Sequence, residues 1–210
     1  MARLIDRGLK ELKRMTLEMG LYSHASYRKA INALNELRDI SGELIKRSYQ
    51  LMMKREEVSS LAIELIARFQ PLASDLRYIK SIMEIAYDYL RIGRYSADIS
   101  LAIRDLAGED GGCDVSIAEK LINSVDHMIT LSIELLESPE EDKAQKIIDL
   151  DNVVDEEYRR VIEKVIEWGD VKCGLLVAFV ARYLERIGDH AYYIADSIYY
   201  YLNGYRIAKV

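Results

Sequence analysis

Glycine and proline are scarce in this chain of 210 residues, which contains 11 and 2 of them. Sheet proteins use these residues in their many turns, so their scarcity argues for few turns and long helices. No run longer than nine residues lacks Asp, Glu, Lys and Arg, whereas a membrane-spanning helix needs about twenty apolar positions. The sequence therefore excludes spanning helices and favours an all-α fold.

The chain also lacks an excess of basic residues, with 29 Lys and Arg against 35 Asp and Glu and a formal net charge of −6. Proteins that bind the phosphate backbone of nucleic acids present a basic face, so no nucleic-acid partner is expected. The opening MARLIDRGLK is interrupted by Asp6 and Arg7 and has no apolar core of a signal peptide. We therefore expect a cytoplasmic protein.

Cysteine is equally scarce. Cys113 and Cys173 form no zinc-ligand or redox motif, either with each other or with the three histidines. A chain of this length buries enough surface to fold without disulfides. We interpret the two cysteines as unpaired thiols, which suit a reducing compartment.

Apolar residues recur at every third or fourth position, which is typical of helices that bury one face. Six helices are predicted, over residues 3–39, 43–69, 72–107, 115–137, 140–168 and 171–203. Gly20 marks either a kink or an interruption of the first helix, and both alternatives remain open. The glycine-rich residues 108–112 (GEDGG) predict a linker after the third helix.

An internal repeat relates the two sides of this linker. Shifting the chain by 95 residues aligns Arg-Ile-Gly at 91–93 with Arg-Ile-Gly at 186–188, within the third helix of each half. The repeat predicts a tandem duplication of a three-helix bundle.

The second half carries two pairs of carboxylates with a spacing of four residues. They are Asp151 with Asp155 and Glu185 with Asp189. Each pair lies on one face of its helix, where like charges destabilise the helix by about 0.2–0.5 kcal/mol. Two such pairs on consecutive helices need a cation, either a neighbouring arginine or a metal ion. Ligands that are all oxygen favour hard ions.

Three segments resemble the PhoU family, accessory regulators of phosphate uptake. They are residues 184–191 (LERIGDHA), 70–77 (QPLASDLR) and 151–158 (DNVVDEEY). The resemblance covers essentially the whole chain. It implies an all-α fold in which a tandem pair of three-helix bundles, residues 1–107 and 113–210, is related by a pseudo-two-fold axis.

The resemblance also implies a metal site, because paired acidic motifs on adjacent helices bind metal in this family. It points to Asp151, Asp155, Glu185 and Asp189 as ligands of iron or another hard ion such as manganese or magnesium, with zinc less expected. The first half departs from the pattern, with Ser48, Met52, Leu90 and Arg94 at the corresponding positions. No metal is expected there.

The last predicted helix also carries a histidine and several tyrosines. The side chain of His190 points about 100° further round the helix than that of Asp189, so we expect a surface or half-buried histidine. The tyrosines crowded into this helix either flank the core or form a docking surface, which would include a homodimer contact.

The function implied by the resemblance is that of a non-enzymatic adaptor in the cytoplasm. It would negatively control a phosphate ABC transporter and phosphate-responsive signalling. Its partner would be the transporter's ATPase subunit or a membrane-bound phosphate sensor, with peripheral membrane contact only. One alternative is an accessory protein of an ion-driven phosphate carrier. A carboxylate-bridged metalloenzyme is disfavoured, because no Glu-x-x-His pair occurs in the chain.

Overall fold

The computed structural model describes residues 3–107 and 113–206, so the predicted linker at 108–112 lies outside the described residues. The helices are α1 (Asp6–Asn35), α2 (Ser41–Phe69), α3 (Ser74–Leu106), α4 (Glu119–Glu137), α5 (Glu141–Ile166) and α6 (Val171–Asn203), with a short 3-10 turn (Ser116–Ala118) before α4. Each predicted helix is present within four residues of its expected bounds, and the all-α prediction is confirmed. Among the described residues, no helix has both the length and the apolarity needed to cross a membrane.

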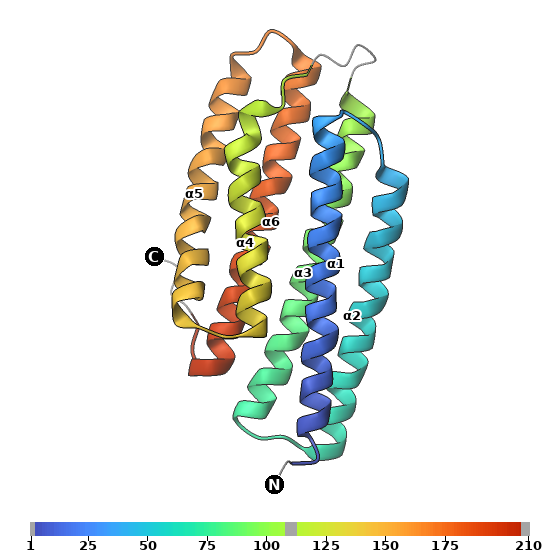
Figure 1. The fold of residues 1–210 in the computed structure, drawn as a ribbon, viewed down its shortest axis with the longest axis vertical. Coiled ribbons are helices and arrows are strands. Elements are labelled where there is room, and N and C mark those ends of the chain that lie inside the picture. Colours follow the sequence, from blue (N-terminus) through green and yellow to red (C-terminus); the bar gives the residue numbers. More distant parts are fainter. Residues whose placement is uncertain (1–2, 108–112, 207–210) are drawn as a thin grey trace.

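The helices form two bundles of three that lie side by side (Figure 1). Helices α1 and α2 pack on α3, helices α4 and α5 pack on α6, and the bundles meet chiefly where α3 contacts α6. A smaller contact joins α1 to α4. Because α3 and α6 run in opposite directions, the α2–α3 turn and the α5–α6 turn lie at opposite ends of the molecule (Figure 1). The tandem-bundle prediction is confirmed, and the domain limits 1–107 and 113–210 stay a prediction.

The repeated Arg-Ile-Gly has the same packing role in both bundles. A Cβ atom on Gly93 would lie 2.2 Å from Leu51 Cδ1 of α2. A Cβ atom on Gly188 would lie 3.1 Å from Val154 Cγ1 of α5. Glycine at these positions therefore lets the second helix of each bundle approach the third closely.

Gly20 is likewise a position of close contact. Helix α1 continues through it without interruption. An added Cβ atom would lie 2.9 Å from the Tyr89 ring of α3 and 3.1 Å from Ile133 of α4. The glycine is explained by the meeting of the two bundles at this point rather than by a break in the helix.

The cysteines are not free. Cys113 and Cys173 form a disulfide with Cα atoms 5.3 Å apart, which joins the segment before α4 to the first turn of α6. The prediction of unpaired thiols is therefore wrong, and the argument for a reducing compartment loses its basis. The spacing of cysteines in a short motif can indicate a metal or redox site. It cannot reveal a disulfide between two cysteines that are 60 residues apart in the sequence.

Reduction of this disulfide should lower the free energy of unfolding by about 2–4 kcal/mol, because the bond restricts the unfolded chain over a long loop. Urea unfolding with and without dithiothreitol measures the difference. The Cys113→Ser/Cys173→Ser variant is the control and should match the reduced chain under both conditions. Identical unfolding midpoints for oxidised and reduced wild type would contradict the expectation.

Candidate metal centre

The four predicted carboxylates lie on α5 and α6, which pack against each other in the second bundle. Asp151 is buried and Asp155 is half-buried on α5. The side chains of Glu185 and Asp189 on α6 are only 13% and 14% exposed. The helices thus place all four groups away from bulk solvent, where the cost of unbalanced charge is high.

Electrostatic repulsion shows which of the carboxylates lie close together. The pKa of Glu185 is raised by burial first, then by the charge of Asp189 and more weakly by that of Asp155. Since Asp155 belongs to α5, the two acidic pairs interact across the helix interface. Glu185 Oε2 is also buried without a hydrogen-bond partner.

Two arginines of α6 supply the positive charge. Arg182 donates from Nη1 to Glu185 Oε1 at 2.9 Å, and Arg186 donates from Nη1 to Asp189 Oδ2 at 3.2 Å. This is the arginine alternative raised by the sequence. Their side chains are 40% and 41% exposed, and ion pairs of such exposure contribute at most about 1 kcal/mol each. The arginines therefore balance the carboxylates without fixing them strongly.

Within residues 3–107 and 113–206, no three His, Cys, Asp or Glu side chains converge as a set that could hold a metal ion. The fold brings Asp155, Glu185 and Asp189 into electrostatic contact, yet their oxygens do not point at one shared position. The assignment of the four carboxylates as metal ligands stays a prediction.

The corresponding positions of the first bundle carry no carboxylate. Ser48 is buried and Leu90 is half-buried, while Arg94 is exposed and Met52 is 40% exposed. The first bundle thus offers uncharged side chains and a cation where the second offers oxygen ligands. That this half binds no metal also stays a prediction.

A buried hydrogen bond between the bundles was not predicted from the sequence. His190 is buried, so the expectation of a surface or half-buried residue is wrong, and its Nδ1 lies 2.8 Å from Asp88 Oδ1 of α3. Burial raises the pKa of Asp88, and the hydrogen bond with His190 opposes that rise. No signal marks Asp88 in the sequence, because the 95-residue repeat aligns it with Tyr183.

Glu185 should destabilise the fold at neutral pH. Because its pKa is raised in the folded chain, its ionisation costs stability as the pH rises from below the ordinary value to above the raised one. Glu185→Gln should therefore raise the free energy of unfolding at pH 7 by about 0.5 kcal/mol and leave it unchanged near pH 3.

Urea unfolding at the two pH values checks this expectation. The control is Glu156→Gln on the exposed face of α5, which should give no gain at either pH. A Glu185→Gln chain that is less stable than wild type at pH 7 would show that the carboxylate is net favourable.

Known proteins resemble this chain over nearly its full length. The family model "PhoU domain" matches residues 16–103 and 118–198. The phosphate-specific transport system accessory protein PhoU homolog of Clostridium acetobutylicum is 29% identical, over 98% of this chain and 97% of its own length. The Synechocystis sp. protein of the same description is 30% identical, over 96% of this chain and 92% of its own.

The fold is similar to a solved structure as well. The crystal structure of the phosphate transport system regulatory protein PhoU from Streptococcus pneumoniae has a TM-score of 0.86 and 22% identity, and the match covers 98% of this chain and 100% of that chain. The helix order, the two bundles and the sequence matches agree. This chain belongs to the PhoU family.

Proposed function

We propose that the protein regulates phosphate uptake as a non-enzymatic adaptor. The observation that carries the proposal is the match, over nearly the whole chain, to relatives named as accessory proteins of phosphate-specific transport. The adaptor would act in the cytoplasm and negatively control a phosphate ABC transporter. Its contact would be the ATPase subunit or a membrane-bound phosphate sensor, and through it the adaptor would report phosphate supply to gene expression.

An aromatic seam between α3 and α6 supports an adaptor role. Phe179 and Tyr183 of α6 stack with ring centroids 6.3 Å apart, and Tyr183 stacks on Tyr95 of α3 at 6.1 Å. Phe179 is 46% exposed, and so is Tyr87, which lies eight residues before Tyr95 in α3. Exposed aromatic side chains on a rigid scaffold are enriched in protein interfaces. We assign the seam, Tyr87, Tyr95, Phe179, Tyr183 and Tyr193, as the partner-binding surface, with a second copy of the chain as the alternative occupant.

The adaptor proposal predicts uncontrolled uptake in a strain that lacks this chain. In phosphate-rich medium, uptake of labelled phosphate should rise several-fold, and the excess should disappear when the ABC transporter is also deleted. If it disappears only on deletion of an ion-driven carrier, the accessory role at that carrier is correct instead. Unchanged uptake in the single deletion would refute both.

Substitutions in the aromatic seam test whether it is the surface that binds the partner. Tyr87→Ala/Phe179→Ala/Tyr193→Ala should fail to restore control and fail to co-purify with the ATPase subunit or sensor, because the few aromatic residues that dominate an interface cost about 2 kcal/mol or more when truncated. The control Tyr49→Ala/Tyr205→Ala removes exposed aromatics elsewhere and should behave as wild type. Light scattering of both variants tests whether the seam instead holds a dimer.

We also propose that Asp151, Asp155, Glu185 and Asp189 bind iron or another hard ion such as manganese or magnesium, with zinc less favoured. The donor chemistry fits, since all four groups offer oxygen. Glu185 Oε2 is buried without a hydrogen-bond partner. Burial first, and then repulsion from Asp189 and Asp155, raise the pKa of Glu185, and a cation would relieve that repulsion. Binding would require Arg182 and Arg186 to turn into solvent, and their exposure permits this movement.

Metal analysis after loading and desalting tests the site. Wild type should retain metal, whereas Glu185→Gln/Asp189→Asn should retain at least about tenfold less, because each lost carboxylate removes both a ligand and a charge. The control Glu156→Gln/Glu163→Gln makes the same charge change on exposed positions of α5 and should load as wild type. Equal, negligible metal in all three chains would remove the metal site and leave the adaptor role intact.

A further inference from the structure

The free end of the first bundle exposes several large apolar side chains. Leu4, before α1, is 87% exposed, and Leu72, in the α2–α3 turn, is 81% exposed. Phe69 at the end of α2 and Leu76 in the first turn of α3 add exposures of 39% and 42%. We call these four residues the apolar tip. Single exposed apolar residues are ordinary, but several at one end of a molecule indicate a binding surface.

Contacts among α1, α2 and α3 hold the apolar tip together. Arg3, next to Leu4, donates to Asp75 of α3 at 2.6 Å. This bond ties the start of α1 to the start of α3. A Cβ atom on Gly8 would clash with Leu65, so α1 and α2 are also in close contact here. The tip is therefore one surface made from three chain segments.

The α2–α3 turn that carries Leu72 contains two residues with positive φ. Gln70 and Ala73, on either side of Leu72, have φ values of 45° and 46°. Residues other than glycine adopt this left-handed region at a cost of about 1–3 kcal/mol. Gln70 is the left-handed C-cap of α2, a common way for a helix to end. Ala73, directly after Leu72, has no such role, and strain of this kind is found chiefly at functional positions.

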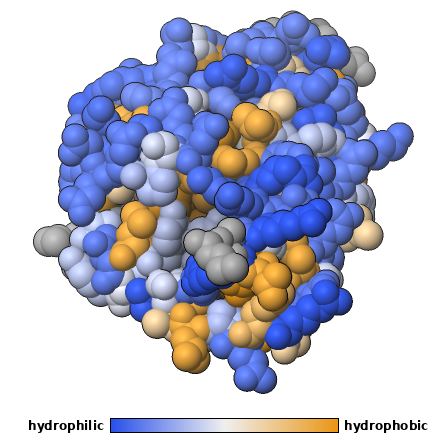
Figure 2. All heavy atoms as spheres, turned by 60° about the horizontal axis from the view of Figure 1, so that its bottom comes forward, coloured by the Kyte–Doolittle hydropathy of each residue, from blue (hydrophilic) through white to orange (hydrophobic). Residues whose placement is uncertain are grey.

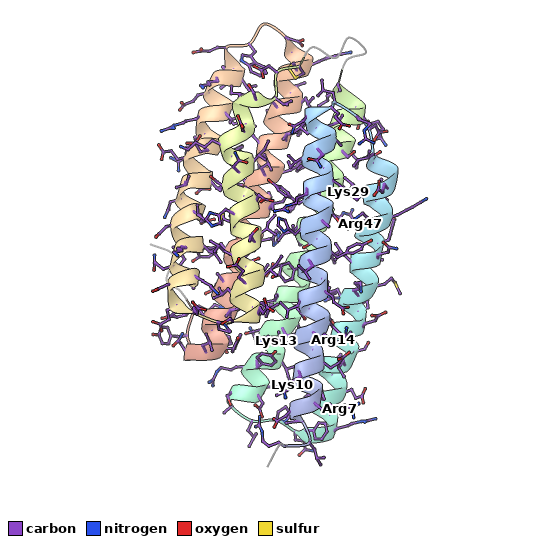
Figure 3. All side chains as sticks on the ribbon, viewed as in Figure 1. Arg7, Lys10, Lys13, Arg14, Lys29 and Arg47 are labelled. Atoms are coloured by element: carbon purple, nitrogen blue, oxygen red, sulfur yellow. A yellow bond between two sulfur atoms is a disulfide. The ribbon has the colours of Figure 1, made fainter. Side chains whose placement is uncertain are left out.

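Basic residues surround the tip. The first fourteen residues contain five basic and two acidic side chains, in a chain whose net charge is −6. Arg7, Lys10 and Arg14 recur at intervals of three and four, which places them on one face of α1, and Arg3 lies just before the helix. Arg7 and Lys10 are exposed and make no ion pair with any described residue. Figure 3 shows both at the same end of α1.

The shape of the molecule leaves this end free to meet a flat surface. The lower ends of α1, α2 and α3 project beyond those of α4, α5 and α6 (Figure 1). The acidic residues at the α4–α5 turn, Glu140 and Glu141, belong to the recessed bundle. Figure 2, which brings this end forward, shows apolar side chains among strongly hydrophilic ones.

We propose that the apolar tip, with Arg7 and Lys10, docks on the surface of an anionic phospholipid bilayer. Apolar side chains gain by entering the boundary between headgroups and acyl chains, and basic side chains beside them are attracted to anionic headgroups. The excess of five basic over two acidic side chains in residues 1–14, at one end of a chain whose net charge is −6, favours the membrane. The proposal does not depend on the adaptor role.

The opposite end of the molecule provides a matched comparison. The α5–α6 turn also exposes apolar residues, with Ile166 at 76% and Val171 at 72%. Residues 163–172 carry three acidic and two basic side chains, so this end lacks the positive charge. It should not bind lipid.

Vesicle flotation tests the proposal with the full chain and two lipid mixtures, phosphatidylcholine alone and phosphatidylcholine with phosphatidylglycerol. Wild type should float with the anionic vesicles, and the bound fraction should fall as salt is added. Arg7→Glu/Lys10→Glu should weaken binding by at least about 25-fold, since each basic residue near the surface contributes about fivefold. Leu72→Ser should also weaken it, and Ile166→Ser/Val171→Ser should bind as wild type.

Thermal unfolding of each variant confirms that it is folded before its binding is compared. Wild type that remains unbound by anionic vesicles would overturn the proposal. Equal binding by Arg7→Glu/Lys10→Glu and wild type would overturn it as well. Because the vesicles contain no protein, the result bears on lipid alone and is independent of any failure to bind a transporter.

Discussion

The packing of α3 against α6 determines where everything else in this molecule lies. These two helices carry the repeated Arg-Ile-Gly, and each receives two other helices on its remaining faces. Their contact includes the buried pair of Asp88 and His190 at 2.8 Å. Removing one member of a buried polar pair leaves the other without its hydrogen bond, which costs about 1–3 kcal/mol. The pair therefore disfavours other alignments of the two bundles more than it adds to the free energy of unfolding.

That contact also sets the chemistry of α6. One side of the helix is committed to α3, so Glu185 and Asp189 face α5 and its acidic pair. Burial raises the free-energy cost of ionising these two carboxylates. Arg182 and Arg186 of the same helix lower that cost by forming ion pairs with them. The two arginines are half-exposed, so these ion pairs hold the carboxylates only weakly.

The fold was predictable from the sequence because it depends on features that recur at regular intervals along the chain. Apolar spacing located all six helices, and the repeated Arg-Ile-Gly related the two bundles. What it missed depends on distance through space. Asp88 has no counterpart in the repeat, the partner of Cys113 is 60 residues away, and Gly20 is explained only by Tyr89 and Ile133 from other helices. Likewise, spacing placed the four carboxylates on two helices and offered either a neighbouring arginine or a metal ion as the balancing cation, but it did not decide between them. The structure pairs Arg182 with Glu185 and Arg186 with Asp189.

The antiparallel order of the bundles gives the protein two unlike ends separated by the length of its helices. Helix α3 has 33 residues, which at 1.5 Å per residue is about 50 Å. If the end formed by residues 3–14 contacts a surface, the α5–α6 turn and the disulfide near it lie at the far end of the molecule from that surface. The length of the third helix thus sets how far apart the two ends lie.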